Sequence, residues 1–270
     1  MAEHIERPEM LTTRRFWNAN PCGAQGSYED LKAQRYAMEP WVPKELRTIA
    51  AAQPRSVLEI GCGQGVDSIE LCFLLPAESS YVGVDYSENS IAVAQANATA
   101  CYSRLAVTPS YQVGNAEALP FENARFDAVY SMGVLHHTHD ERRAIAEVLR
   151  VLRPEGTAYI ALYRKPSVKV GIAQGLRLLQ KSVDSVFRTD RSIYSLIKRF
   201  GTSSKMFGTM FHECFGVPYL KWYNRREIET LFSGFSKVSL KIYGANLGRL
   251  SRGGDRETPT GYFWYITASK

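Results

Sequence analysis

Three closely spaced glycines and a later carboxylate give this sequence the outline of a nucleotide-binding site. Gly61, Gly63 and Gly65 come directly after a β-forming run at residues 56–60 and before a helical pattern. A glycine turn between strand and helix lets a ligand approach the backbone, where a Cβ would clash, and the helix start offers N–H groups. Asp85 ends the next β-forming run, roughly 20 residues later, where a carboxylate can accept both hydroxyls of a ribose. The spacing therefore predicts a ribose-containing cofactor.

The loop departs from two familiar nucleotide motifs. The dinucleotide fingerprint is G-x-G-x-x-G, whereas this loop is G-x-G-x-G and has Val66 where the third glycine would stand. The phosphate-binding motif G-x-x-x-x-G-K-S/T occurs nowhere in the sequence. Neither motif therefore identifies the nucleotide.

A further acidic residue changes the comparison. With Glu59 two residues before the first glycine, the loop resembles the first motif of the class I S-adenosylmethionine-dependent methyltransferases, typically E-x-G-x-G-x-G. Three later stretches resemble that family's later motifs in the right order: GNAEALPF at residues 114–121, FDAVYSMGVLHH at 126–137 and LRVLRPEG at 149–156. The likeness covers residues 55–163 and is greatest to the small-molecule branch that includes the quinone C-methyltransferases. Residues 16–23 and 35–40 also resemble an N-terminal element of some of those enzymes.

The resemblance implies that S-adenosylmethionine binds at these motifs and leaves as S-adenosylhomocysteine. Asp85 would hold the ribose, Tyr86 would pack on the adenine, and the glycines would face the ribose and the methionine portion. Asn115 stands where the family usually has Asp, so its contact with the adenine amino group would use a neutral carbonyl. The residues expected to bind the cofactor are Glu59, Gly61, Cys62, Gly63, Gly65, Asp85, Tyr86, Ser87, Asn115, Ala116, Glu117, Ser131 and Met132.

Histidines follow the fourth predicted strand, at the sheet edge where ligands bind in open α/β folds. His136 is a candidate general base, because an unperturbed imidazole titrates at about pH 6.5, and packing within the protein is the alternative. A metal site built from His136, His137, His139 and Asp140 is disfavoured, because no second cluster of ligands is visible. We therefore expect no metal.

Aromatic side chains are expected to line the acceptor side of the site. A ring face attracts a cation such as a sulfonium by about 0.5 to 2 kcal/mol, although ordinary packing is the alternative for any one ring. The candidates for substrate binding are Phe16, Trp17, Tyr28, Tyr223 and the imidazole of His136.

Nucleic acid is a disfavoured substrate, although the sequence pI is about 9.0. Cys22 precedes the cofactor motif, which is the wrong position for the nucleophile of a cytosine C5-methylase. The Asn-Pro-Pro-aromatic signature of exocyclic amino methylases is absent after the fourth predicted strand.

The elements that must position these residues form a regular alternation. Strands are predicted at residues 56–60, 81–84, 111–113, 126–131, 157–163, 237–243 and 262–267, and helices at 28–39, 43–52, 139–152, 166–216 in large part, and 225–232. Near-continuous apolar strands alternating with helices predict an α/β fold, a doubly wound, Rossmann-like sheet of seven mostly parallel strands with an antiparallel last strand. We expect an N-terminal helical cap (1–54), a cofactor-binding core (55–164), a basic helical lid (165–222) and a C-terminal part of the core (223–270).

The positive charge is concentrated in the lid. The whole chain carries a formal charge of +6, whereas residues 164–205 hold ten Lys and Arg against two Asp. Val168, Ile172, Leu176, Leu179, Val183 and Val186 form an apolar helical stripe in this segment. Such a helix can lie on an anionic membrane through residues 165–200 or cap the site by packing on the core.

Composition sets the remaining limits. A content of 45% hydrophobic and 22% charged residues excludes a disordered or fibrous chain. No apolar N-terminal region of a signal peptide and no run long enough to span a bilayer is present. Five cysteines without a Cys-x-x-Cys pair indicate reduced thiols, and hence a cytoplasmic protein. The oligomeric state is left open.

The expected reaction is methyl transfer to an oxygen, nitrogen or carbon nucleophile of a small molecule. Two alternatives stay open: a methyltransferase that acts at a membrane surface on a quinone or lipid-like substrate, and a cofactor-binding protein without catalytic activity. A nucleic-acid methyltransferase would show strong, salt-dependent binding to RNA or DNA.

Overall fold

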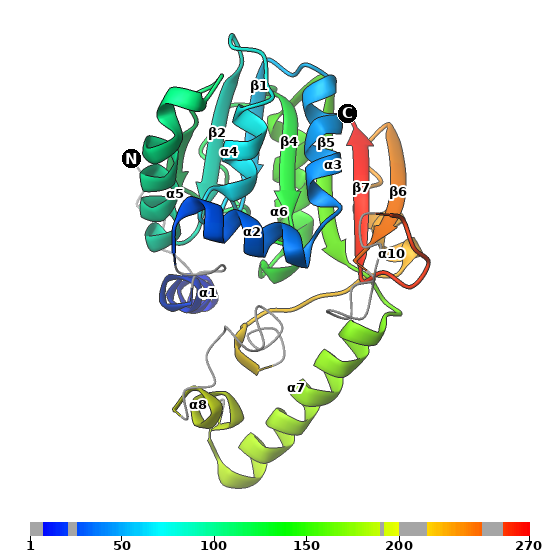
Figure 1. Cartoon of the computed structure of the whole chain (residues 1–270). Coiled ribbons are helices and arrows are strands. Elements are labelled where there is room, and N and C mark those ends of the chain that lie inside the picture. The colour runs from blue at the N-terminus through cyan, green and yellow to red at the C-terminus, as the bar shows by residue number, and fades with distance from the viewer. Residues whose placement is uncertain (1–7, 21–25, 190–191, 200–214, 245–255) are drawn as a thin grey trace.

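The computed structural model describes residues 8–20, 26–189, 192–199, 215–244 and 256–270. In this part of the chain, a seven-stranded sheet with the order β3-β2-β1-β4-β5-β7-β6 forms the centre (Figure 1). Its strands are β1 (Ser56–Ile60), β2 (Ser80–Asp85), β3 (Ser110–Val113), β4 (Phe126–Met132), β5 (Leu152–Tyr163), β6 (Lys237–Tyr243) and β7 (Phe263–Ser269). Adjacent strands are parallel except at β7, which is antiparallel to both β5 and β6. The predicted antiparallel last strand is confirmed.

Helices cover both faces of the sheet. They are α1 (Pro8–Ala19), α2 (Tyr28–Met38), α3 (Val42–Ala51), α4 (Val66–Cys72), α5 (Glu88–Cys101), α6 (Glu141–Val151), α7 (Val168–Phe187), α8 (Ser192–Arg199) and α10 (Arg225–Leu231), with short 3-10 turns at Tyr102–Arg104 and at Leu135–His137, the latter called η2. Asn224 and Glu227 form a capping box at the start of α10. Helix α1 was not predicted from the sequence.

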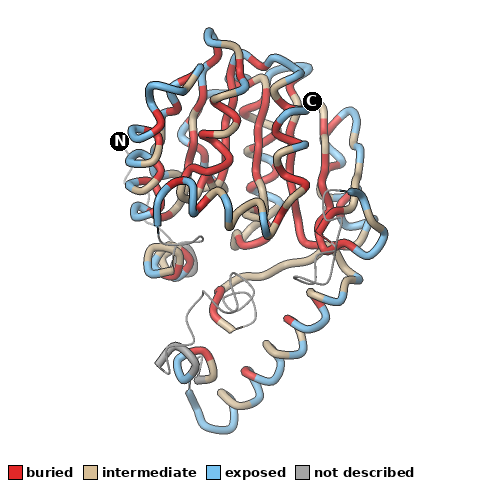
Figure 2. Tube along the Cα trace, viewed as in Figure 1, coloured by how far each residue is buried: buried red, intermediate tan, exposed pale blue. Residues whose placement is uncertain are grey.

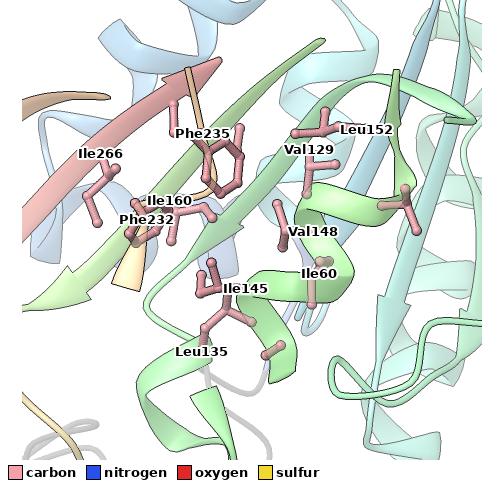
Figure 3. Packing of buried hydrophobic residues seen from close by; sticks show 14 of the residues in the cluster. Ile60, Val129, Leu135, Ile145, Val148, Leu152, Ile160, Phe232, Phe235 and Ile266 are labelled. Atoms are coloured by element: carbon pink, nitrogen blue, oxygen red, sulfur yellow. The ribbon is translucent and has the colours of Figure 1, made fainter. Parts of the chain in front are cut away.

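One face of the sheet is covered by α6 and α10. Ile145 and Val148 of α6 pack with Val129 and Ile160 of the strands and with Phe232, as Figure 3 shows. The apolar positions of α6 recur at three- and four-residue spacing, so one side of the helix is buried completely. Leu135 of η2 belongs to the same cluster, so this core also holds the turn that follows β4.

Residues 153–156, which separate the predicted helix at 139–152 from the predicted strand at 157–163, lie inside a strand. Strand β5 starts at Leu152 opposite Phe126, and the next paired residues are Thr157 and Ala128. Four residues on β5 therefore span a gap of one residue on β4, which makes this segment a bulge. Glu155, at φ +64°, adopts the left-handed conformation within it.

Two buried carboxylates tie the N-terminal helices to the C-terminal strands. Glu39, after α2, accepts hydrogen bonds from Trp41 Nε1 and from the Tyr262 hydroxyl, each at 2.6 Å. Glu45 of α3 accepts one from the Tyr243 hydroxyl at 2.6 Å. The Trp41 ring stacks on Tyr243 with 4.5 Å between centroids. The cap is thereby anchored on β6 and β7, next to β5.

Helix α7 projects away from the sheet, and much of its surface is exposed (Figures 1 and 2). Its buried residues are Val170, Ala173 and Gln180. Four members of the predicted apolar stripe are exposed instead: Val168, Ile172, Leu179 and Val186. Among the described residues, α7 and α8 carry most of the exposed large hydrophobic side chains. This stripe therefore does not pack on the core.

Replacement of Trp41, which is completely buried, tests the anchoring of the cap. Trp41→Ala should lower the free energy of unfolding by about 3 to 5 kcal/mol, because it leaves a cavity and removes a donor to Glu39. Trp41→Phe should cost less, since a ring still stacks on Tyr243. Urea denaturation measures both.

Leu178→Ala is the matched control, because that side chain is 65% exposed and should change stability by less than about 0.5 kcal/mol. Equal losses in Trp41→Ala and Leu178→Ala would contradict the anchoring role.

Candidate cofactor and acceptor site

The glycine loop connects β1 to α4 in a conformation that favours glycine. Gly61, Gly63 and Gly65 have φ values of +79°, +51° and +84°. A Cβ on Gly61 would lie 2.3 Å from Cγ2 of Val134, so a side chain there would collide with the loop that follows β4. Nothing lies within 4 Å of the Cβ position of Gly63. The loop therefore leaves a cradle for a ligand beside the end of β1.

Asp85 holds this loop from the end of β2. Its carboxylate accepts hydrogen bonds from the backbone N–H of Gly63 at 2.9 Å and of Ser87 at 2.8 Å. Burial raises the pKa of Asp85, and the backbone donors oppose that rise. The side chain reaches the cavity, where its oxygens can accept hydroxyl groups of a ribose.

A cavity of about 270 Å³ opens beside these groups. The loops after β1, β2, β3 and β4 contribute to its wall, together with α1, α2, β5, α7 and β7. The predicted site residues that line it are Trp17, Glu59, Gly61, Cys62, Gly63, Asp85, Tyr86, Asn115, Ala116, Glu117 and Met132.

Other predicted site residues lie outside the cavity wall: Phe16, Tyr28, Gly65, Ser87, Ser131, His136 and Tyr223. Several have structural contacts instead. Ser87 caps α5 by accepting the N–H of Ser90, and Ser131 donates to the Ile60 carbonyl at 2.9 Å. The Tyr28 hydroxyl donates to Glu70 at 2.6 Å. These residues shape the site without facing its interior.

Asn115 and Glu117 belong to a turn that closes the adenine end expected from the motifs. Asn115 Oδ1 accepts the backbone N–H of Glu117 at 2.9 Å. Glu117 Oε1 accepts the N–H of Asp140, and the Glu117 carbonyl accepts Arg143 Nε at 2.7 Å. The turn is therefore fastened to the start of α6.

Two carboxylates, one before and one after the glycine loop in the sequence, line the cavity. Asp67 of α4 accepts hydrogen bonds from Arg35 Nη2 at 2.7 Å and from the Tyr130 hydroxyl at 2.9 Å. Glu59 accepts a hydrogen bond from the Tyr81 hydroxyl at 2.8 Å. Burial raises the pKa of Glu59 to about 8. Arg35 and Asp67 line the cavity but were not predicted, because only the packing of α2 over α4 brings them there.

Among the described residues, the end of the cavity beyond the cofactor motifs is aromatic and includes Lys169. Lys169 Nζ lies 4.2 Å from the ring centroid of Tyr262 and 4.8 Å from that of Tyr163, and it donates to the Tyr163 hydroxyl at 3.2 Å. The cavity wall at this end includes the aromatic rings of Tyr163, Phe263 and Trp17. Sequence patterns gave no signal for Lys169, because its position depends on how α7 leaves β5.

His136 is not placed as a base. Its side chain is completely buried and stacks on Tyr163 with 4.0 Å between centroids. Neither of its ring nitrogens has a hydrogen-bond partner within the described chain. Burial lowers the pKa of His136 well below its usual range, and nearby His137 and Lys169 act in the same direction. Its neighbour His137 does line the cavity.

Within the described ranges, no group of three or more His, Cys, Asp or Glu side chains is arranged to hold a metal ion. In the same ranges, no helix is both long and apolar enough to cross a membrane.

Comparison with known proteins agrees with this geometry. A family model described as a methyltransferase domain matches residues 58–160. The demethylmenaquinone methyltransferase of Staphylococcus carnosus is 25% identical over 224 residues, which is 82% of this chain and 85% of that protein. O-methyltransferase cnsE of Penicillium expansum is 32% identical over 42% of this chain and 40% of its own length. Apart from the Staphylococcus protein, the chain spans about half the length, or less, of the curated relatives it matches.

Solved structures share the fold. A Thermotoga maritima S-adenosylmethionine-dependent methyltransferase, described as a possible histamine N-methyltransferase, superposes with a TM-score of 0.57 at 17% identity, covering 96% of this chain and 99% of that one. A methyltransferase from Aquifex aeolicus superposes with a TM-score of 0.52 at 12% identity, and the match covers 87% of this chain and 92% of that one. The family match identifies residues 58–160 as a methyltransferase domain, and together with the motif order and the cradle it supports a class I S-adenosylmethionine-dependent methyltransferase.

Proposed function

We propose that the protein transfers the methyl group of S-adenosylmethionine to a nucleophile of a small molecule. The observation that carries the proposal is the single cavity wall shared by Asp85, the glycine cradle and the aromatic end near Tyr163. Donor and acceptor would occupy one enclosed space, which is what direct transfer between them requires.

The residues fit the donor at several points. Asp85 would hold the ribose hydroxyls, and the cradle at Gly61 and Gly63 would take the part of the donor between ribose and methionine. Glu59 would lie close to the positively charged end of the donor. When bound, the donor supplies an activated methyl group on a sulfonium. The protein's part is to align the acceptor with that methyl, to exclude water and to accept a proton where the nucleophile must lose one.

The acceptor end favours a compound with an apolar ring. Trp17, Tyr163 and Phe263 offer aromatic surface, and Met132 and Val134 add further apolar wall. A quinone or a lipid-like molecule would fit such a wall, and the name of the Staphylococcus relative contains one quinone, demethylmenaquinone. A small polar acceptor would leave these rings without contact.

Two other functions predict different behaviour. A cofactor-binding protein without catalytic activity would form a tight complex but never label an acceptor. A nucleic-acid methyltransferase would bind RNA or DNA with strong salt dependence.

A cytoplasmic location is also part of our proposal. It is supported by Cys62, Cys72 and Cys101, which are free thiols in the structure.

The most direct test of the activity is to incubate the protein with a metabolite extract and an isotope-labelled methyl donor. Mass spectrometry should find a labelled small molecule that is absent when the donor or the protein is omitted. A protein that binds the donor and labels nothing in extracts of several organisms would instead favour the non-catalytic alternative.

Asp85 gives a prediction for binding. Asp85→Ala should weaken binding of S-adenosylhomocysteine by about 10- to 100-fold, because hydrogen bonds to a charged group contribute about 1.5 to 3 kcal/mol. Isothermal titration calorimetry measures the change. Glu122→Ala is the control, since this exposed carboxylate lies outside the cavity wall and should leave the affinity unaltered. Unchanged affinity in Asp85→Ala would contradict the assignment of the ribose.

The exposed face of α7 supports a peripheral contact with an anionic membrane. Val168, Ile172, Leu179 and Val186 present apolar surface on this face, and the exposed Lys181 lies on the same helix. Exposed apolar patches of this kind mark interaction surfaces, and each base near an anionic bilayer contributes about 1 kcal/mol. A lipid-like acceptor could then enter from the bilayer.

Sedimentation with vesicles tests this contact. The protein should sediment with phosphatidylglycerol vesicles at low salt and much less with phosphatidylcholine vesicles. Replacing both Leu179 and Val186 with serine should reduce binding by about tenfold or more, because two apolar side chains no longer enter the bilayer.

Leu74→Ser is the matched control, because Leu74 is 47% exposed and lies outside α7. Absence of sedimentation with anionic vesicles at low salt would remove the membrane contact from the proposal.

A further inference from the structure

His137, one residue beyond the histidine that the sequence favoured, faces the cavity from η2. It is 8% exposed and contributes to the cavity wall. The turn η2 follows β4, so His137 lies at the same sheet edge as Met132 and the glycine cradle. Trp17 of α1 packs its ring edge against the imidazole, with 5.3 Å between centroids. The side chain is therefore held at the junction of the donor and acceptor regions.

The hydrogen bond at Nδ1 determines where the lone pair of His137 lies. Nδ1 is 2.9 Å from the carbonyl oxygen of Tyr219. A carbonyl can only accept, so Nδ1 must carry the hydrogen, and in the neutral ring Nε2 then carries the lone pair. This is the arrangement that a general base needs, because the backbone partner fixes the ring and also stabilises the protonated form.

Residues 215–223, which we call the strap, hold that carbonyl in place. The N–H of Lys221 donates to the His136 carbonyl at 3.0 Å, and Lys221 Nζ donates to the His139 carbonyl at 2.6 Å. On the other side, Gln180 and Arg177 of α7 donate to the carbonyls of Phe215 and Val217. The strap is thus fastened between η2 and α7, and Tyr219 lies between these attachments.

The charged and titratable neighbours of His137 are compatible with a transient proton. His136, whose ring centroid lies 4.3 Å away, stays neutral because burial lowers its pKa. The Tyr163 ring lies 6.2 Å away and also contacts Lys169. The Glu39 carboxylate, which lines the same cavity, interacts with Lys169 and offsets its charge. A hydroxyl acceptor must lose its proton on methylation, so it is the kind of nucleophile that uses a base.

We propose that Nε2 of His137 removes the proton from an acceptor hydroxyl on an apolar ring compound, a proposal that rests on the function given above. The O–H bond breaks and its proton goes to Nε2, while an oxygen electron pair forms the bond to the methyl carbon. The electron pair of the methyl–sulfur bond stays on sulfur, which leaves S-adenosylhomocysteine. One positive charge disappears from sulfur as one appears on the imidazole, so the net charge of the cavity is unchanged.

Two variants separate the base from the contact that positions it. His137→Asn retains an amide donor near the position of Nδ1 for the Tyr219 carbonyl but has no group at Nε2. His137→Gln places an amide near Nε2, where it cannot act as a base. Both should lower kcat by about 100-fold or more, which is the ordinary contribution of a general base. The affinity for S-adenosylhomocysteine should stay within about twofold of the wild-type value.

The tautomer provides a readout that needs no turnover. Nitrogen-15 spectra of histidine-labelled protein, saturated with S-adenosylhomocysteine, should show His137 protonated at Nδ1, the signal being assigned by its loss in His137→Asn. A proton on Nε2 instead would overturn the proposal.

The methyltransferase activity of these variants is measured with the fraction of the metabolite extract that the wild-type protein labels with isotope-labelled methyl groups. Wild-type rates in His137→Asn would also overturn the proposal while leaving the methyltransferase function intact. Failure of the wild-type protein to bind S-adenosylhomocysteine would instead count against the proposed function.

Discussion

The site depends on the point where the strand order reverses, between β1 and β4. The chain proceeds from β1 through β2 to β3 on one side and then returns to β4 and β5 on the other. Connections that leave in opposite directions open a crevice at the carboxyl ends of these two parallel strands. The loops that follow them meet there so closely that Gly61 has no room for a Cβ beside Val134. The donor cradle and the loop bearing His137 are therefore parts of one packed unit.

Buried carboxylates keep the remaining elements in register with that crevice. Asp67 joins α2 and β4 to α4 through Arg35 and Tyr130, and Glu39 joins the end of α2 to Tyr262 beside β7. Each is surrounded by donors, as burial of an acidic group requires. These contacts bring residues distant in sequence to the two ends of one cavity. The N-terminal helices are thus part of the site as well as of the cap.

The sequence predicted the core well because its signals are local. Apolar runs fixed the strands, and the spacing from Gly61 to Asp85 fixed the cofactor end. The bulge in β5 was missed because Pro154 and Gly156 resemble an ordinary turn, and only the pairing with β4 shows that the strand continues. Helix α1 was missed as well. The choice between His136 and His137 depends on which of two adjacent rings faces the cavity. That is a property of packing that residue spacing does not encode. The positions of Lys169 and of the exposed stripe of α7 depend on how α7 leaves β5, which is also a tertiary property.

The central claim is that this crevice binds a sulfonium nucleoside and not a dinucleotide, and one calorimetric experiment tests it most directly. The wild-type protein is titrated separately with S-adenosylhomocysteine and with NAD under the same conditions. The structure predicts saturable binding of S-adenosylhomocysteine with one site per chain and no heat of binding for NAD. Saturable binding of NAD with none for S-adenosylhomocysteine would contradict the account.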